Sequence, residues 1–390
     1  MKNTGFKKLA LARPRTLGIA AISFVASGVA LASTAAQAGG YNFETINDPA
    51  DKPFPPPPAT GGVTFTNLMG ITSNGDTIPG FYGSGQKGDP NTGFVLTLPG
   101  KTFTPSNAIF PGLAPPFNAA QTQMTAINGN GTTFTGYTYP TNNGVPVDFQ
   151  FGFYERGGVF HMVNNPATPN CGATPNPCDS GVITENQLIG VNNANLAVGF
   201  YNDIHGDSHG YTYNIKTNTF SANINFPNAV STVTAAINNS DEIAGFFTDS
   251  SGVIHGFIDN AKRDAFTPFS VPGAAETELL GINDNGLAVG FECAVAGCSG
   301  GPQHGVIYNI AANTFTTLDP PGSTATTFNG LNDRGQIVGF FVDRAGNTDG
   351  LLANPVPEPS TWIMILAGFA GLGGLGLRRL RRPEIARALT

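Results

Sequence analysis

One hairpin-forming sequence recurs along most of this chain and limits its fold more than any other feature. The best copy, residues 281–291, reads GINDNGLAVGF, in which apolar, strand-forming ends flank residues that suit a tight type I′ turn with positive φ angles. Successive copies of this sequence lie 56, 64, 46, 45 and 49 residues apart, which is typical of four-stranded propeller blades rather than helical solenoids. Six copies align without gaps, beginning at Gly70, Ala126, Gly190, Ala236, Gly281 and Gly330.

Each repeat carries further strand signals after the hairpin. A His-Gly or Asp-Gly pair before apolar residues marks a third strand, and a Phe-Thr pair marks a fourth, as at Phe315. The sixth repeat stops near Leu352 without its Phe-Thr strand, but residues 42–49 (NFETINDP) resemble one. Closing the ring with that segment would remove exposed strand edges. The sequence therefore predicts an all-β fold, a six-bladed β-propeller over residues 39–354 closed by its N-terminal strand.

The charge of this repeat region excludes some classes of partner. It holds 9 of the 19 basic residues and 24 of the 26 acidic ones, which gives a net charge near −15 (9 − 24). Nucleic acids and anionic lipid surfaces are bound through positive patches, so neither is an expected partner. The 51 Gly, 30 Pro and 12% charged residues of the chain suit a turn-rich β domain.

The first 38 residues have the three parts of a signal peptide. Five basic residues precede a mostly apolar stretch over 17–31, and Ala36, Gln37 and Ala38 form a small-x-small cleavage site. We expect cleavage before Gly39 and export of the mature chain. An uncleaved membrane anchor is the alternative, although the apolar stretch is short for a bilayer span.

The chain changes character again after Leu352. The box Val356, Pro357, Glu358 and Pro359 precedes an apolar run that ends at Leu377, and four arginines follow at Arg378, Arg379, Arg381 and Arg382. An apolar run with a positive flank predicts a transmembrane helix over 361–377 and a cytoplasmic tail over 383–390. A buried globular helix is the alternative, which the proline-rich entry and the arginine cluster disfavour.

These C-terminal residues, 355–382, closely resemble the PEP-CTERM sorting signal, also catalogued as the ice-binding-protein C-terminal motif. The resemblance implies an exported protein of a Gram-negative bacterium that is anchored in the inner membrane and then processed by exosortase. It also implies a final place at the cell surface or in the extracellular matrix, with exopolysaccharide and biofilm as the biological context. The motif itself implies nothing about ice.

The repeats resemble the extracellular HAF-type repeat family, in which a Gly-Ile-Asn-Asp-x-Gly hairpin precedes a His-Gly-Phe strand. The copies that begin at Gly281 and Gly330 match best, and those at Gly70 and Ala126 match poorly. This resemblance implies no established activity.

Four cysteines form two local pairs, Cys171 with Cys178 and Cys293 with Cys298. Close, even pairs in an exported chain predict disulfides that pin loops. A zinc site is the alternative, but neither spacing is CxxC and no histidine lies nearby to complete a tetrahedral set.

No cofactor is expected, and calcium is the alternative that the Asn- and Asp-rich turns raise. Hard cations bind several oxygens of a tight loop, but no turn here carries the full EF-hand pattern. The loop from Asp203 to Asp207 is a second cation candidate. His209, His255 and His304 occupy one repeat position, so we expect them to serve the repeat rather than to converge on a metal.

The sequence contains no GxSxG, Walker A, HExxH or helix-opening GxGxxG motif. We therefore expect a protein that binds glycan or another surface protein without catalysis. The alternative is an enzyme that acts on extracellular polysaccharide, with two carboxylates meeting at the mouth of the propeller channel. Five tyrosines are candidate platforms for sugar stacking: Tyr82, Tyr137, Tyr139, Tyr154 and Tyr201.

Overall fold

A computed structural model describes residues 36–38, 40–48, 65–83, 91–108, 117–142, 145–146, 149–260, 265–298 and 301–356. The expectations for the signal peptide over 1–35, for Gly39 and for the C-terminal segment from residue 357 onward lie outside this part of the chain. That includes the expected transmembrane helix over 361–377 and the expected tail over 383–390. Within the described ranges, no helix is long and apolar enough to cross a membrane.

Antiparallel pairing groups the described strands into six four-stranded units, here called blades 1 to 6. Blade 1 contains β3 (Phe65–Leu68), β4 (Thr77–Gly83), β5 (Thr92–Thr97) and β6 (Thr102–Pro105). Blade 2 contains β7 (Phe117–Ile127), β8 (Phe134–Asn142), β10 (Phe151–Arg156) and β11 (Val159–Val163), and the short β9 (Val145–Pro146) pairs with β8. Blade 3 contains β12 (Asn186–Val191), β13 (Leu196–Asn202), β14 (Ser208–Asn214) and β15 (Thr219–Phe220).

The later blades repeat this plan. Blade 4 contains β16 (Ser231–Ile237), β17 (Glu242–Thr248), β18 (Ile254–Asn260) and β19 (Ala265–Phe269). Blade 5 contains β20 (Glu276–Ile282), β21 (Leu287–Cys293), the 3-10 turn η1 (Ala296–Cys298), β22 (Gln303–Asn309) and β23 (Thr314–Leu318). Blade 6 contains β24 (Ser323–Leu331), β25 (Ile337–Asp343), β26 (Thr348–Pro355) and β2 (Tyr41–Thr45), with β1 (Ala36–Ala38) paired outside β2.

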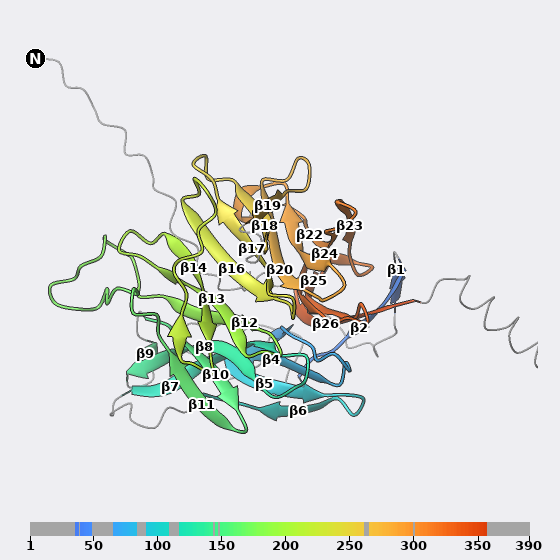
Figure 1. Ribbon diagram of the computed structural model, residues 1–390. Coiled ribbons are helices and arrows are strands. Elements are labelled where there is room, and N and C mark those ends of the chain that lie inside the picture. The colour runs from blue at the N-terminus through green and yellow to red at the C-terminus, as the bar shows by residue number, and fades with distance from the viewer. Residues whose placement is uncertain are drawn as a thin grey trace, which may run out of the picture.

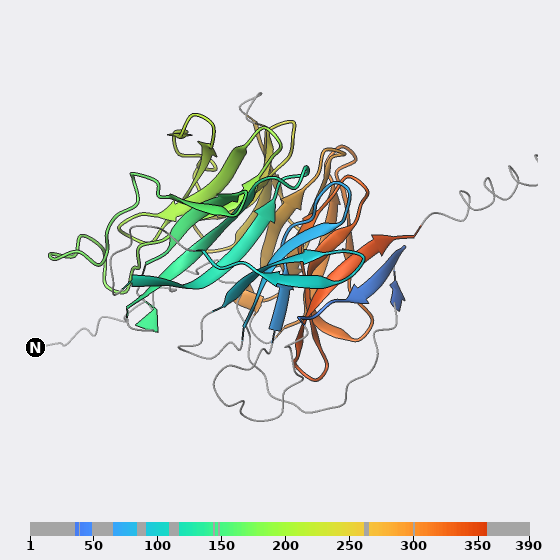
Figure 2. The ribbon, with the colours of Figure 1, turned by 90° about the horizontal axis from the view of Figure 1, so that it is seen from below.

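The blades follow one another around a common centre, which makes the fold propeller-like. Figure 1 shows the chain colour advancing around this centre until β26, at the red end, lies beside the blue β2, and Figure 2 shows the same neighbours from below. Single parallel residue pairs, such as Gln303 with Ala325, link neighbouring blades.

The N-terminal strand completes the last blade, as the sequence predicted. Strand β2 runs antiparallel to β26, with Phe43 opposite Ala353 and Thr45 opposite Leu351. The pairing continues past the strand end, where the backbone N–H of Ile46 donates to the carbonyl of Gly350 at 2.8 Å. The first and last described segments of the chain therefore share one sheet.

The hydrophobic core lies between the blades because each sheet buries its faces against its neighbours. Phe43 and Phe328 of blade 6 pack in one cluster with Val289 of blade 5. Ile46 of blade 6 packs with Leu68 and Phe94 of blade 1. Apolar side chains from different blades are thus buried together, and the burial of apolar surface is the main favourable contribution to folding.

The last glycine of the hairpin motif is explained by its contact with the facing strand. At Gly290, a Cβ atom would lie 1.8 Å from the carbonyl oxygen of Glu278, and at Gly199 it would lie 2.0 Å from that of Gln187. The motif therefore needs glycine where the two strands of the hairpin approach most closely.

The hairpin turns differ from the expected type I′ geometry. A type I′ turn needs two consecutive residues with positive φ, but each described turn has one, such as Gly286 (φ 75°) or Asn195 (φ 63°). The Asn that opens the turn stabilises it in place of a second residue with positive φ. Its side-chain oxygen accepts backbone N–H groups, as Asn283 does from Asn285 and Leu287. This arrangement is an Asx turn, which is why five of the six copies carry Asn at that position; the first copy has Thr72, whose hydroxyl oxygen accepts the N–H of Thr77.

Candidate functional site: the central channel

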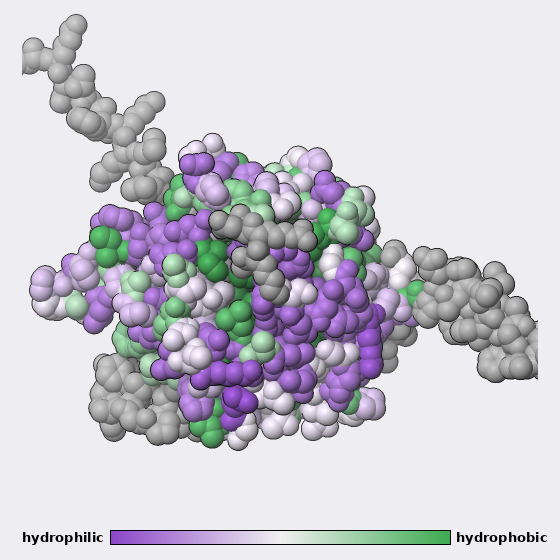
Figure 3. Space-filling model, in the orientation of Figure 1, coloured by the Kyte–Doolittle hydropathy of each residue, from purple (hydrophilic) through white to green (hydrophobic). Residues whose placement is uncertain are grey.

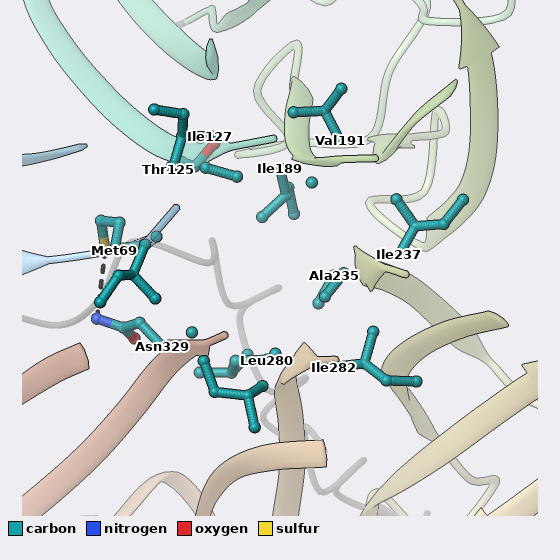
Figure 4. A pocket seen from close by; sticks show the side chains of 18 of the residues that line it. Met69, Thr125, Ile127, Ile189, Val191, Ala235, Ile237, Leu280, Ile282 and Asn329 are labelled. Carbon is teal, nitrogen blue, oxygen red and sulfur yellow. Dashed lines mark hydrogen bonds between the residues drawn. The ribbon is translucent and has the colours of Figure 1, made fainter. Parts of the chain in front are cut away.

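A channel lies between the innermost strands of the six blades and encloses about 820 Å³, part of it open to solvent. Figure 4 shows side chains of these strands converging on it. Its first layer holds one residue from each blade: Met69, Thr125, Ile189, Ala235, Leu280 and Asn329. A layer of branched aliphatic residues lies nearer the hairpin turns: Ile71, Ile127, Val191, Ile237, Ile282 and Leu331.

Small residues separate these two layers because the blade backbones meet there. A Cβ atom at Gly330 would lie 2.6 Å from the carbonyl oxygen of Met69, and one at Gly281 would lie 2.9 Å from the Cα of Gly330. The pairing register shifts at the same place, between Leu279 and Gly281 in β20. Such a bulge turns an extra side chain toward the channel, here Leu280. The first residue of the motif, Gly or Ala, therefore allows the ring to close.

Four asparagines, here called the asparagine ring, join the hairpin turns of blades 3, 4, 5, 6 and 1 at one end of the channel. Each amide nitrogen donates to a backbone carbonyl of the next blade: Asn192 to Asn238, Asn238 to Asn283, Asn283 to Asn332, and Asn332 to Thr72, at 3.0 to 3.1 Å. The side-chain oxygens meanwhile hold their own turns. Each of these four asparagines thus holds its own turn and links two blades, whereas Asn128 of blade 2 donates to Thr132 within its own turn. The depression above them encloses about 410 Å³.

The turns give calcium few unengaged oxygens. Asp284, which follows the motif Asn, accepts hydrogen bonds from both the backbone and the side chain of Asn239 at 2.7 Å. In the described part of the chain, one group of three metal-ligating side chains comes close together, namely Glu276 with Cys293 and Cys298. Both of those thiols are joined in a disulfide, so this group does not offer them to a metal.

A buried carboxyl group lies beside the channel wall between blades 2 and 3. Glu185 is 1% exposed, and its oxygens accept hydrogen bonds from Gln187 Nε2 (3.0 Å) and Asn202 Nδ2 (2.5 Å). Gln187 also donates to Gln150 (2.6 Å), whose own amide donates to the hydroxyl of Tyr139. The result is a network of neutral donors around one carboxyl group.

Burial controls ionisation in this network. It raises the pKa of Glu185 from 4.5 to about 7, while hydrogen bonds from Asn202, Gln150 and Gln187 oppose the shift. Burial also raises the pKa of the Tyr139 hydroxyl, which therefore stays neutral at ordinary pH. Glu185 is thus the carboxyl group in this network that can change charge near neutrality.

The repeated histidines do not converge. Each pairs with an aspartate of its own blade: His209 with Asp203 (3.2 Å), His255 with Asp249 (3.2 Å) and His304 with Asp319 (2.5 Å). They serve individual blades, as their repeat position indicated.

The loop from Asp203 to Asp207 uses its main carboxylate internally. Asp203 Oδ1 accepts the backbone N–H groups of His205 (2.8 Å) and Asp207 (3.0 Å), and Oδ2 contacts His209. Burial opposes ionisation, but these hydrogen bonds outweigh it and lower the pKa of Asp203. The loop therefore forms the same kind of Asx turn as the hairpins.

The cysteines form two disulfides, between the pairs indicated by their spacing. Cys171 bonds to Cys178 in the long loop between β11 and β12. Cys293 bonds to Cys298, but Cys293 is the last residue of β21 rather than a loop residue. Both bridges lie in the region expected to be exported.

The five tyrosines proposed as sugar platforms are not equivalent. Tyr137 and Tyr201 are buried, so their ring faces are unavailable to a ligand. Tyr82, Tyr139 and Tyr154 are partly exposed, and Tyr154 stacks on His161 with ring centroids 4.6 Å apart. Figure 3 shows hydrophobic atoms near the centre of one face of the molecule, among more hydrophilic surroundings.

Sequence reasoning missed the Glu185 network and Asn329, which with Thr125 is a polar member of the first channel layer. Neither belongs to the repeat: the motif has no consistent polar residue at these positions. Non-repeated side chains give no periodic signal, so only the fold shows that Gln150, Glu185 and Gln187 meet.

Comparison with known proteins identifies one segment of the chain. Residues 355–382 match the PEP-CTERM protein-sorting motif. This motif implies processing by exosortase, export and sorting to the cell surface. No curated protein matches the sequence. The resemblance of the repeats to the HAF-type family stays a prediction.

Solved structures similar to this chain include propeller-like folds. TolB from Acinetobacter baumannii aligns with 12% identity over 72% of this chain and 60% of its own, with a TM-score of 0.44. A sialidase from Trypanosoma rangeli aligns with 7% identity over 87% of this chain and 62% of its own, with a TM-score of 0.46. The β-propeller domain of the trilobed protease from Pyrococcus furiosus aligns with 7% identity over 75% and 86% of the respective chains, with a TM-score of 0.40. This chain thus spans less than two thirds of the first two proteins.

Proposed function

We propose that this protein is an exported six-bladed β-propeller, closed by its N-terminal strand, that binds glycan or protein outside the cell without catalysis. A signal peptide over 1–38 directs export, and a transmembrane helix over 361–377 holds an inner-membrane intermediate. Exosortase then delivers the domain to the cell surface or the biofilm matrix. The observation that carries this proposal is that the sorting motif begins at Pro355, the last residue of β26 in the closing blade.

Many Asp and Asn side chains are engaged in hydrogen bonds within turns and between blades, which supports binding over catalysis. Asp203, Asp249 and Asp343 each accept two backbone N–H groups in their own turns. The asparagine ring is likewise engaged in holding the blades. These groups build the scaffold, so recognition falls to the loops and to the partly exposed aromatic side chains such as Tyr154.

The test is binding of the processed protein, recovered from an exporting host, to an array of bacterial exopolysaccharides and surface proteins, with and without calcium. We expect retention of at least one glycan or protein in both conditions. A matched sample with Tyr154→Ala tests the aromatic platform, and Asn170→Ala in an exposed loop is the control. Failure to retain any array member in either condition would contradict the binding role.

The alternative function is an enzyme that acts on extracellular polysaccharide, and Glu185 is the observation that favours it. A carboxyl group with a pKa near 7 can act as a general acid. Release of reducing ends from exopolysaccharide by the processed protein, abolished by Glu185→Gln, would support that enzyme. Absence of release would favour the binding role.

A further inference from the structure

The histidine of blade 3 has a partner at both ring nitrogens. Nε2 of His209 contacts Asp203 at 3.2 Å, and Nδ1 contacts the side-chain oxygen of Asn225 at 3.1 Å. The ring of Tyr201, on the adjacent strand, packs against the imidazole with ring centroids 5.4 Å apart. Blade 4 repeats these three contacts with its own set of residues, His255, Asp249, Ser270 and Phe247. In both blades the histidine is therefore fully engaged in holding the blade.

Blade 5 keeps the histidine but changes two of its three neighbours. Nδ1 of His304 contacts Asp319 at 2.5 Å, in the same way as Nδ1 in the other two blades. The residue aligned with the aspartate that binds Nε2 is Ala294, which has no polar side-chain atom, and the residue aligned with the aromatic ring is Glu292. Because Nδ1 has the same anchor in all three blades, Nε2 of His304 points toward β21, the strand that carries Glu292.

Glu292 is a nearly buried carboxyl group without a partner. It is 9% exposed and lies directly opposite His304 in the pairing of β21 with β22, so both side chains are on the same face of blade 5. Burial raises the pKa of Glu292, while the charge of His304 lowers it and that of Asp319 raises it. In the described part of the chain no hydrogen bond or ion pair engages this carboxyl group, yet its oxygens are not among the fully enclosed, unpaired atoms. A ligand can therefore reach them.

The charges around this site favour a cationic group. Glu292 and Asp319 are both carboxyl groups, and the repeat region has a net charge near −15 (9 − 24). In the neutral tautomer that donates from Nδ1 to Asp319, Nε2 of His304 is a hydrogen-bond acceptor, as is the ionised Glu292. An ammonium group has three donors, so it can donate to both acceptors at once, and its bond to the carboxylate is charge-assisted.

The depth of the site favours lysine over an amino sugar as the source of the ammonium group. The carboxyl group of Glu292 is recessed beside the buried Cys293, whereas Val295, in the loop that follows, is 44% exposed. A lysine carries its ammonium group at the tip of a flexible four-carbon stem, which enters a narrow opening and packs along exposed apolar residues. An amino sugar carries the group directly on its ring, so the whole ring would have to enter.

We propose that blade 5 binds a lysine side chain of a protein partner, whose ammonium group donates to the Glu292 carboxylate and to Nε2 of His304. Asp319 holds the imidazole in the orientation that leaves Nε2 as an acceptor. This inference rests on the binding role proposed above and specifies one site and one class of partner for it.

The test is isothermal titration calorimetry of the processed protein with two peptides that differ only in the charge of lysine. The first is Gly-Lys-Gly-Lys-Gly with blocked ends, and the second is the same peptide with both lysines acetylated. We expect the first to bind at least about tenfold more tightly, the effect of one charge-assisted hydrogen bond. Equal affinities, or binding of neither peptide, would overturn the proposal. A glucosamine tetramer that binds as tightly as the first peptide would contradict the choice of lysine.

Variants place the binding at blade 5. Glu292→Gln keeps the shape of the side chain and should weaken the unmodified peptide at least about tenfold. His255→Gln, at the matched position of blade 4, should leave the affinity unchanged, because Nε2 of His255 is already bonded to Asp249. Asp179→Asn removes one exposed negative charge elsewhere and controls for the change in net charge. Unchanged affinity in Glu292→Gln would contradict this site. If the array retains a glycan while neither peptide binds, the lysine site is wrong and the binding role stands.

Discussion

Val356 donates its backbone N–H to the carbonyl oxygen of Gly40 at 2.8 Å. One residue further in, Tyr41 pairs with Pro355. The first residue of the sorting box and the residue just before β2 are therefore bonded to each other. Figures 1 and 2 show β2 and the end of β26 at the same edge of the molecule. The sorting motif, residues 355–382, therefore begins at the edge of blade 6, where β2 pairs with β26.

Removing the buried ring of β2 should destabilise the whole domain. Phe43 is 4% exposed and packs with Leu351 and Phe328, so Phe43→Ala should cost about 3 to 5 kcal/mol of unfolding free energy. Urea denaturation followed by circular dichroism measures this. The neighbouring Asn42 is exposed, and Asn42→Ala is the matched control with an expected change within about 0.5 kcal/mol. Equal effects of the two substitutions would show that β2 is not part of the closed ring.

Breaking one member of the asparagine ring should affect two blades. Asn283→Ala removes two hydrogen bonds within its turn and the bond to the carbonyl of Asn332, which keeps the N–H of Gly335 at 3.0 Å, so we expect a loss of about 2 to 4 kcal/mol for three hydrogen bonds. The control is Asn170→Ala, which removes one exposed hydrogen bond to Gly172 and should cost about 1 kcal/mol or less. Urea denaturation of both variants gives the comparison. A loss at Asn283 no larger than at Asn170 would mean that the ring contributes nothing.

The features predicted correctly from the sequence are those that repetition makes visible. The six hairpins, the N-terminal strand opposite Leu351 and the two cysteine pairs are all present in the structure. A repeated pattern averages over local exceptions, and a strand missing at one terminus can be matched to a surplus strand at the other. The type I′ turn was wrong because turn residues tolerate several conformations, and the side chain of Asn283 decides between them.

The candidate sites were invisible for the opposite reason. Asn329 occupies a bulge position where the other blades carry Met69, Thr125, Ile189, Ala235 and Leu280. Glu185 meets Gln150 of the preceding blade across a long loop. Because such contacts depend on the register of several strands at once, no local pattern encodes them, and only the assembled blades bring these residues together.

The motif glycine of β21 should tolerate no side chain. A Cβ atom at residue 290 would lie 1.8 Å from a backbone oxygen of Glu278, which cannot move without separating the hairpin strands. We expect Gly290→Ala to lose at least about 3 kcal/mol of stability or to prevent folding. Gly100→Ala is the control, since its nearest neighbour, the hydroxyl oxygen of Thr102, would be 3.5 Å away. Thermal unfolding of both variants measures the difference, and similar midpoints would contradict the close strand approach.

Glu185 should make the stability of the protein depend on pH below neutrality. Its pKa in the folded state, about 7, exceeds its ordinary value of 4.5, so the unfolded chain releases this proton first as pH rises. The favourable contribution of the protonated, buried group is complete below pH 4.5 and is lost progressively up to about pH 7, by about 3 kcal/mol.

Glu185→Gln isolates this effect, because glutamine keeps the shape of the protonated acid and cannot ionise. We expect the variant to match the native chain near pH 4.5 and to exceed it by about 2 to 3 kcal/mol at pH 8. The measurement is urea denaturation of both proteins at several pH values between 4.5 and 8. Subtracting one curve from the other removes the contributions of all other titrating groups, including Asp349, whose pKa burial also raises. A difference that stays constant across this range would show that Glu185 is ionised throughout, and that the amides of Gln187 and Asn202 are sufficient to stabilise its charge.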